Sequence, residues 1–318
     1  MNDINKLVIE FLHSDKYCGS NTELKSECIY SDDRKIFLIN CADKKYIYKT
    51  IGTSRKSTDE FSIEYDLMTE IFGMTKGKFS MPFPLLLLDD GFLMTACEGE
   101  PLKDKYFNSV LRINERKKIF KAFKQSAEWL SGFHSCTLKS SDYHEVLENR
   151  RQHLVRMIDS INAIECSDSV SNFMEEILLF FDKVNAKDKV GLCQLHGNFA
   201  LRNILYNDKS VSLIDFEDSK FDCMYYDLGM FIAEVMNKSI YIINKKYNKC
   251  LIDTFLNEYT RLIDLDDDML NSYILYHLVC AYYDVVNRKT PSNMIKKYAL
   301  AHKRSYTISI IRSFLSTV

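Results

Sequence analysis

The sequence predicts an α+β fold, with a small antiparallel sheet near the N-terminus and a larger, mainly helical part after it. Three observations support this class. Short apolar and aromatic segments separated by turn residues occupy residues 24–50, a pattern typical of strands joined by hairpins. Helical apolar periodicity dominates after residue 115. Between those helices, residues 194–218 read as two short strands with polar side chains gathered at their ends.

The N-terminal elements follow one another closely. A short amphipathic helix is predicted from apolar residues at helical spacing: Ile4, Leu7, Val8, Phe11 and Leu12. Three strands are then expected at residues 24–30, 35–41 and 45–50, joined by hairpin turns at residues 31–33 and 42–44.

A helix is predicted next, from Ser57 to about Phe72, with Ser57 or Thr58 as its N-cap. One face carries an acidic residue among apolar ones: Phe61, Glu64, Leu67, Met68 and Ile71. A carboxylate in such surroundings needs a cationic partner, because an unpaired buried charge is costly. Lys49 is the candidate, and Glu60 and Glu70 are the alternatives to Glu64. A proline-rich break at residues 81–84 precedes a further hairpin around Asp90-Gly91.

The C-terminal part is predicted to be helical at residues 115–134, 143–163, 170–184, 225–234, 251–263, 269–287 and 293–315. His134 lies on an apolar face of the first of these helices, so a structural role is favoured over that of a catalytic base. The acidic run Asp264–Asp268 has two interpretations. It caps the next helix, or it attracts a cationic substrate.

Composition excludes several classes of protein. A formal net charge of −2 gives no support to nucleic-acid binding, and 46% hydrophobic with 27% charged residues is typical of a globular chain. The ten cysteines form no CxxC pair, so we expect reduced cysteines in the core rather than a zinc cluster. No signal peptide or membrane span is expected, and the predicted location is the cytoplasm. The sequence indicates no oligomeric state.

Residues 194–218 hold the densest group of candidate site residues: His196, Asn198, Asn203, Asp215 and Glu217. Carboxylate and amide oxygens are the ligands that Mg²⁺ accepts, with phosphate and water completing its shell. The segment is therefore a candidate site for a metal ion and a phosphate. The alternative is an ordinary surface hairpin whose Asn and Asp residues form turns.

The spacing His-Gly-Asn-x-x-x-x-Asn, followed by Leu-Ile-Asp-Phe-Glu, resembles the loops of the aminoglycoside phosphotransferase and choline kinase family. That resemblance implies a bilobal, protein-kinase-like fold. It implies catalytic roles for His196 and Asn198 and places Mg²⁺ on Asn203 and Asp215. One departure is important, because the family has Asp, the catalytic base, where this chain has Asn198.

The same resemblance extends along the chain. It implies that Lys49 and Glu64 form the phosphate-binding pair, and that backbone groups from Thr95 to Cys97 bind the adenine. It divides the chain into a nucleotide-binding lobe at residues 1–97 and a helical lobe, with the catalytic and metal loops and the substrate site, at residues 98–318. An Asp at the place of Asp227 would support the catalytic loop. No glycine-rich loop joins the first two strands.

The resulting hypothesis is an ATP- or GTP-dependent, Mg²⁺-dependent kinase that phosphorylates a hydroxyl group of a small molecule such as a sugar or an aminoglycoside-like compound. Glu217 or Asp218 could replace the missing base. The alternative is a kinase-like protein with weak or no catalytic activity, which binds a nucleotide or a partner.

Overall fold

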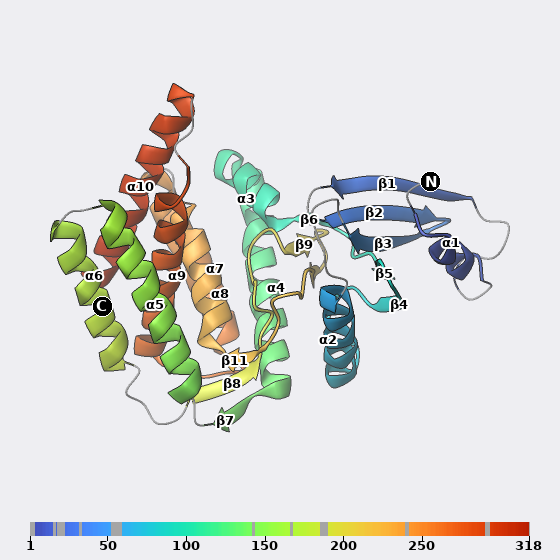
Figure 1. The fold of residues 1–318 in the computed structure, drawn as a ribbon, viewed down its shortest axis with the longest axis horizontal. Helices are drawn as coiled ribbons and strands as arrows, with labels where there is room; N and C mark the ends of the chain where they lie inside the picture. The colour runs from blue at the N-terminus through green and yellow to red at the C-terminus, as the bar shows by residue number, and fades with distance from the viewer. Residues whose placement is uncertain are drawn as a thin grey trace. The chain divides into compact units, whose positions relative to one another are not determined.

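The computed structural model describes residues 4–14, 17, 23–31, 34–51, 59–141, 144–165, 168–184, 190–238, 242–289 and 293–317. The chain divides into two compact units: Met1–Glu100 with Ile204–Glu217, and Pro101–Asn203 with Asp218–Val318. The first is built around an antiparallel sheet and the second is mainly helical (Figure 1). The predicted α+β class, with a small sheet part and a larger helical part, is confirmed.

The first unit contains a five-stranded antiparallel sheet in the order β1-β2-β3-β5-β4. The elements of this unit are α1 (Lys6–Leu12), β1 (Leu24–Ser31), β2 (Arg34–Cys41), β3 (Lys44–Ile51), α2 (Asp59–Thr75), β4 (Pro84–Leu88), β5 (Gly91–Thr95), β9 (Ile204–Tyr206) and β10 (Val211–Leu213). Glu100, which ends the first of its two segments, begins β6 (Glu100–Pro101). The predicted strands at 24–30, 35–41 and 45–50 are present. The proposed caps Ser57 and Thr58, and the turn residues Asp32 and Asp33, lie outside the described residues.

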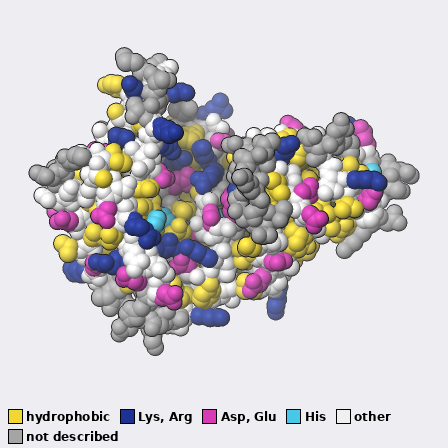
Figure 2. All heavy atoms as spheres, viewed as in Figure 1, with side chains coloured by type: hydrophobic (Ala, Val, Ile, Leu, Met, Phe, Trp, Pro, Cys, Tyr) yellow, Lys and Arg dark blue, Asp and Glu magenta, His cyan; other side chains and the backbone are white. Residues whose placement is uncertain are grey.

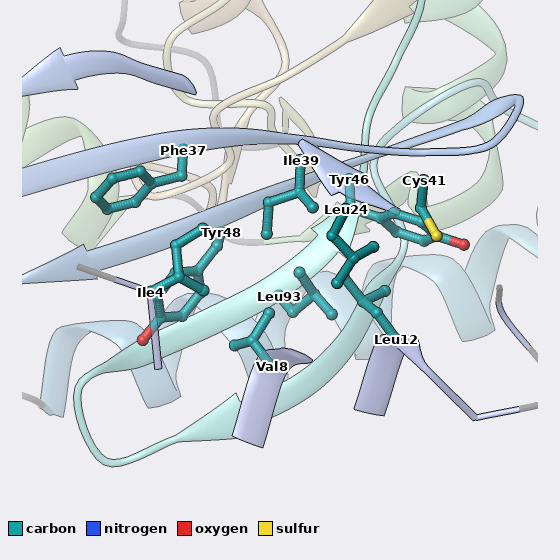
Figure 3. Packing of buried hydrophobic residues seen from close by; sticks show 10 residues of the cluster. All are labelled: Ile4, Val8, Leu12, Leu24, Phe37, Ile39, Cys41, Tyr46, Tyr48 and Leu93. Carbon is teal, nitrogen blue, oxygen red and sulfur yellow. The ribbon is translucent and has the colours of Figure 1, made fainter. Parts of the chain in front are cut away.

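Helix α1 packs on this sheet through its apolar face. Asn5 caps the helix, since its side chain accepts a hydrogen bond of 3.0 Å from the Leu7 N–H. Val8 and Leu12 are fully buried, and Figure 3 shows them pointing toward apolar side chains of the strands, including Tyr46 and Leu93. The predicted N-terminal helix therefore closes one side of the small core.

Cys41, in the same core, is disulfide-bonded, and its partner lies outside the described residues. The expectation that all ten cysteines are reduced is therefore wrong at this position. The other cysteines that the structure describes are free: Cys28, Cys97, Cys136, Cys193, Cys223, Cys250 and Cys280.

The hairpin of β9 and β10 belongs to the first unit although it lies far along the chain. Gly99 packs so closely on β9 that a Cβ atom at Gly99 would lie 2.8 Å from the carbonyl carbon of Tyr206. Gly99 also has a φ of +124°, which side-chain-bearing residues rarely adopt. The turn between the strands is closed by the Asn207 side chain, whose oxygen accepts from the Ser210 N–H at 2.8 Å.

The second unit contains most of the helices. Its elements are α3 (Leu102–Leu111), α4 (Ile113–Thr137), β7 (Lys139–Ser141), α5 (His144–Glu165), α6 (Asp168–Val184), β8 (Val190–Gln194), β11 (Phe221–Cys223), α7 (Tyr225–Asn237), α8 (Ile242–Tyr259), α9 (Asp267–Val286) and α10 (Met294–Leu315). Three short strands form an antiparallel sheet in the order β11-β8-β7. Asp266 caps α9 by accepting from the Met269 N–H at 3.0 Å, so the first interpretation of the acidic run is confirmed for this residue.

Helices α7 and α9 approach each other backbone to backbone. A Cβ atom at Gly229 of α7 would lie 2.6 Å from the carbonyl carbon of Tyr273 on α9, so no larger residue fits there. Both helices are largely buried on the faces that meet. Among the described residues, no helix is both long and apolar enough to cross a membrane.

Candidate active site

In the first unit, Lys49 of β3 and Glu64 of α2 form a buried ion pair. The Lys49 Nζ atom lies 2.8 Å and 2.6 Å from the two carboxylate oxygens of Glu64. The two residues are only 3% and 5% exposed. Burial raises the pKa of the Glu64 carboxyl, and the charge and hydrogen bonds of Lys49 oppose that change. The pair predicted between these elements is present.

Asp215 and Glu217 lie beside the same ammonium group. Lys49 Nζ is 3.5 Å from an oxygen of Asp215 and 3.7 Å from one of Glu217. Arg34 holds both oxygens of Glu217 in a bidentate pair. Asp215 has a φ of +69°, a backbone conformation that Asp and Asn tolerate better than most residues. Three carboxylates thus surround two cations, and the excess negative charge favours a further cation here.

The predicted adenine-binding segment ends β5. The N–H groups of Thr95 and Ala96 donate to the carbonyls of Phe83 and Lys45 at 2.9 Å and 3.0 Å. The Thr95 hydroxyl accepts from the Phe83 N–H at 2.8 Å. Burial raises the pKa of the Cys97 thiol to about 11, so this thiol stays protonated at neutral pH. Because the N–H groups of Thr95 and Ala96 are occupied, a backbone N–H donated to a base by this segment would come from Cys97.

In the second unit, Asp227 of α7 anchors residues 195–203, the loop between β8 and β9, which we call the anchored loop. Its carboxylate accepts hydrogen bonds from the backbone N–H groups of His196 and Gly197 at 2.7 Å and 2.9 Å. Gly197 has a φ of +81°, and a Cβ atom there would lie 1.9 Å from the backbone oxygen of Asp218. Only glycine fits this close approach. The resemblance-based expectation that Asp227 supports the loop agrees with these contacts.

His134 and His196 are both fully buried. The His134 ring nitrogens lie 2.8 Å from the Tyr259 hydroxyl and 3.2 Å from Asp227. Burial raises the pKa of Asp227, but the hydrogen bond and charge of His134 and the contacts with His196 outweigh it, so its pKa is lowered overall. His134 thus has the structural role that its apolar face predicted. The His196 ring accepts from the Asn198 N–H at 3.3 Å, which gives it a positioning role in the loop.

Replacing Asp227 with alanine is expected to destabilise the protein by about 3–5 kcal/mol, because two backbone donors and His134 would lose a buried, charged partner. Chemical unfolding of the purified variant would measure this loss. Asp253→Ala is the matched control, since Asp253 pairs with Lys249 at 3.2 Å on an exposed helical surface and should change the unfolding free energy by less than about 1 kcal/mol. Equal effects of the two substitutions would contradict the anchoring role.

Asn198 and Asn203 project from the same loop. The Asn198 amide donates to an oxygen of Asp218 at 3.2 Å, and its own oxygen accepts from Arg202 at 2.9 Å. Asn203 donates through its amide nitrogen to the backbone oxygen of Asn198 at 2.9 Å. This orientation leaves the Asn203 side-chain oxygen as the atom able to bind a metal ion.

The loop also forms one wall of a pocket within the second unit. This pocket has a volume of about 340 Å³, and residues of α7, α9 and α10 form the rest of its lining. His277 of α9 lines it and is 6% exposed, and its Nε2 atom has no hydrogen-bond partner in the described part of the chain. Burial, assisted by the charge of Arg150, lowers the pKa of His277 to about 3. Its imidazole is therefore neutral at physiological pH.

This low pKa predicts a loss of stability in mild acid. Below about pH 6.5 the unfolded chain protonates His277 whereas the folded chain does not, so stability falls as the pH drops from 6.5 toward 3. The contribution is roughly 2 kcal/mol at pH 5. Urea unfolding at pH 7 and pH 5 should show a smaller loss for His277→Gln than for the wild type. His302→Gln, at an exposed position of α10, should retain the wild-type loss.

The donor atoms fit a hard divalent cation. In the first unit the Asp215 side chain is 31% exposed, and in the second unit Asn203 offers a neutral amide oxygen, and each is an oxygen of the kind that Mg²⁺ accepts. Within the described residues, no group of three or more His, Cys, Asp or Glu side chains is arranged to hold a metal ion. Mg²⁺ sites commonly use only one or two protein ligands, with phosphate and water as the others.

Sequence reasoning undervalued three residues of these sites. Asp218 was one of two candidate bases, and the structure places it against Asn198, whereas Glu217 is held by Arg34. Arg202 was not predicted, although its place directly before Asn203 was a signal. His277 was missed because it lies in an almost wholly apolar stretch of α9, where histidine is normally a core residue.

The middle of the chain matches a known protein family. Residues 84–241, which include the anchored loop and the β9–β10 hairpin, match the family described as phosphotransferase enzyme family. Over this segment, just under half of the chain, the protein is similar to that family. No match was found among curated protein sequences.

Solved structures of phosphotransferases share the fold. Plasmodium vivax ethanolamine kinase is 14% identical, with a TM-score of 0.60 over 98% of this chain and 86% of that one. An aminoglycoside phosphotransferase in a ternary complex with streptomycin and ATP is 16% identical, with a TM-score of 0.58 over 96% and 99%. A glucosamine kinase is 12% identical, with a TM-score of 0.63 over 98% and 80%. At these identities the likeness shows the fold of the phosphotransferase family, as the sequence predicted.

Proposed function

We propose that the protein transfers the γ-phosphoryl group of ATP or GTP to a hydroxyl group of a small molecule. The buried Lys49–Glu64 pair, with Asp215 3.5 Å from the same ammonium group, is the observation that carries this proposal. Such a lysine–glutamate pair, beside a metal-binding aspartate, is a required part of the active kinase site. The match of residues 84–241 to the phosphotransferase enzyme family supports the same reaction class.

In this proposal, Lys49 binds the nucleotide phosphates and Glu64 fixes the position of its ammonium group. The segment from Thr95 to Cys97 binds the base. Asp215 and the oxygen of Asn203 would hold Mg²⁺, which when bound neutralises charge on the transferred phosphoryl group. The use of ATP favours a cytoplasmic site of action.

The acceptor hydroxyl needs a group that takes its proton. The Asn198 amide cannot do this, because an amide oxygen is a very weak base, but it can orient the hydroxyl. Asp218 lies 3.2 Å from the Asn198 amide nitrogen and has a carboxylate. We assign proton acceptance to an oxygen of Asp218 and orientation to Asn198. His196 acts by holding the loop in place.

The second candidate is a kinase-like protein that binds a nucleotide or a partner with little turnover. The amide at Asn198 is the observation that favours it, since general-base catalysis contributes about 10²- to 10⁴-fold to such reactions.

Two measurements separate these candidates. Thermal shifts with Mg·ATP and Mg·GTP would report nucleotide binding, and nucleotide turnover across a panel of hydroxylated acceptors would report catalysis. Binding with acceptor-dependent turnover supports the kinase. Binding without turnover, unimproved by Asn198→Asp, favours the second candidate. Absence of any nucleotide binding contradicts the proposed function.

A further inference from the structure

The pocket of the second unit carries an unusual set of charges for its size. Three cationic side chains and two carboxylates are among its lining residues: Arg202, Lys238, Lys303, Glu234 and Asp284. Figure 2 shows Lys and Arg side chains gathered on the face of this unit over the region between α3 and α10. The partners of these groups decide what ligand the pocket favours.

Glu234 and Lys238 neutralise each other. One oxygen of Glu234 accepts from the Leu201 N–H at 2.7 Å, and the other lies 3.2 Å from the Lys238 ammonium group. Glu234 therefore holds the loop in place and has no charge left for a ligand. Three charged groups of the lining remain: Arg202, Lys303 and Asp284.

Arg202 and Lys303 keep their positive charge available. Arg202 donates to the neutral oxygen of Asn198. Among the residues that the structure describes, no carboxylate lies within 4.0 Å of the cationic group of either residue. The pKa of Lys303 is lowered by partial burial and by the nearby cations Arg288 and Lys238, and Asp284 only partly opposes this. The electrostatic field at Lys303 is therefore positive, and an anion would be stabilised there.

His277 supplies the complementary polar group. Its ring hydrogen-bonds the backbone of Tyr226 through the nitrogen other than Nε2, and it is neutral. A neutral imidazole whose other nitrogen carries the proton has Nε2 as a hydrogen-bond acceptor. A buried acceptor without a partner destabilises the structure, because it has lost its hydrogen bond to water. A hydroxyl donor bound in the pocket would remove this destabilisation.

We propose that the acceptor substrate is a hydroxylated anion, in which a carboxylate or phosphate group binds Lys303 and Arg202 and a hydroxyl donates to His277. This inference rests on the proposed phosphotransfer and assigns its substrate class. Polycationic aminoglycosides and amino sugars lack the charge that the pocket selects. The second interpretation of the acidic run, attraction of a cationic substrate, concerns other residues, because Asp264–Asp268 are not among the lining residues.

Four sugars with one skeleton test the charge preference of the full chain. Calorimetric titrations at fixed ionic strength would use glucuronate, glucose 6-phosphate, glucose and glucosamine. At least one anionic sugar is expected to bind about 10-fold or more tighter than glucose, and the tighter of the two identifies carboxylate or phosphate as the recognised group. Tighter binding of glucosamine, equal binding of all four, or no binding of either anion would overturn the proposal.

A substitution locates the effect. Lys303→Ala should weaken binding of the preferred anion about 10- to 100-fold and leave glucose unaffected, since a hydrogen bond to a charged group is lost. Lys297→Ala, at an exposed position of α10 outside the pocket, should change neither. Unchanged anion affinity in Lys303→Ala would overturn the proposal. Turnover of amino sugars alone would refute the substrate class but leave the phosphotransferase function intact. Absence of nucleotide binding by the wild-type protein would instead contradict the phosphotransferase function.

Discussion

Asp215→Ala is expected to abolish Mg²⁺-dependent nucleotide binding and to lower kcat/KM by about 10³-fold or more. Glu64 is paired with Lys49 and Glu217 is bound by Arg34, whereas Asp215 has no bidentate arginine partner among the described residues. Its removal would take away the charged metal ligand of this unit. At a nucleotide concentration 100 times the dissociation constant, the thermal stabilisation lost corresponds to roughly 2.7 kcal/mol. Thermal shifts with and without Mg²⁺ would measure it.

Backbone strain must be separated from loss of the ligand. Alanine is disfavoured at the φ of +69° that Asp215 adopts, but asparagine tolerates it. Asp215→Asn should therefore fold normally and still lose most of the Mg²⁺ dependence. Glu70→Ala, an exposed carboxylate on α2, is the control and should bind nucleotide normally. Unchanged nucleotide affinity in Asp215→Asn and Asp215→Ala would rule out the metal-binding role.

Asp218→Asn is expected to lower kcat by about 10²- to 10⁴-fold with little change in nucleotide affinity. The reason is that the Asp218 carboxylate accepts a hydrogen bond from the Asn198 side chain, with an oxygen 3.2 Å from the amide nitrogen. Single-turnover kinetics with a hydroxylated acceptor would isolate the chemical step from nucleotide binding. A wild-type rate in Asp218→Asn would exclude Asp218 as the base.

Exchanging the two side chains gives a sharper test. The double variant Asn198→Asp/Asp218→Asn carries its carboxylate at position 198 instead of position 218. It should therefore recover part of the rate lost in Asp218→Asn. Arg202, which donates to the side chain at position 198 at 2.9 Å, would stabilise the new carboxylate. Failure of the exchange to recover any activity would show that the carboxylate is needed at position 218 itself.

Local chemistry predicted much of the fold. The strands of residues 24–50 were found because alternating side chains and turn residues determine hairpins over short distances. The partnership of Lys49 with Glu64 followed from a physical requirement, since a carboxylate on an apolar helix face needs a cation. The role of His134 followed from its apolar face in the same way.

Other features depend on contacts that a single sequence does not show. Helix α3 was not predicted. Helix α8 was predicted only from Leu251, although it begins at Ile242, because its first turns are mainly polar and show little apolar periodicity. The β9–β10 hairpin belongs to the first unit through contacts such as that between Gly99 and Tyr206, which are far apart in the chain. The charge of the pocket depends on three helices and a loop, so no single stretch revealed it.

The absence of a side chain at Gly229 has a mechanical consequence. Helix α7 carries Asp227, which holds the anchored loop, and α9 carries His277, which lines the pocket. The two helices approach each other through their backbones at Gly229. A larger residue at 229 would push the two helices apart, so it would displace the loop and the pocket wall together. We therefore expect changes of ligand preference to be tolerated more readily on α10, where Lys303 lies at an exposed position, than on this closely packed pair.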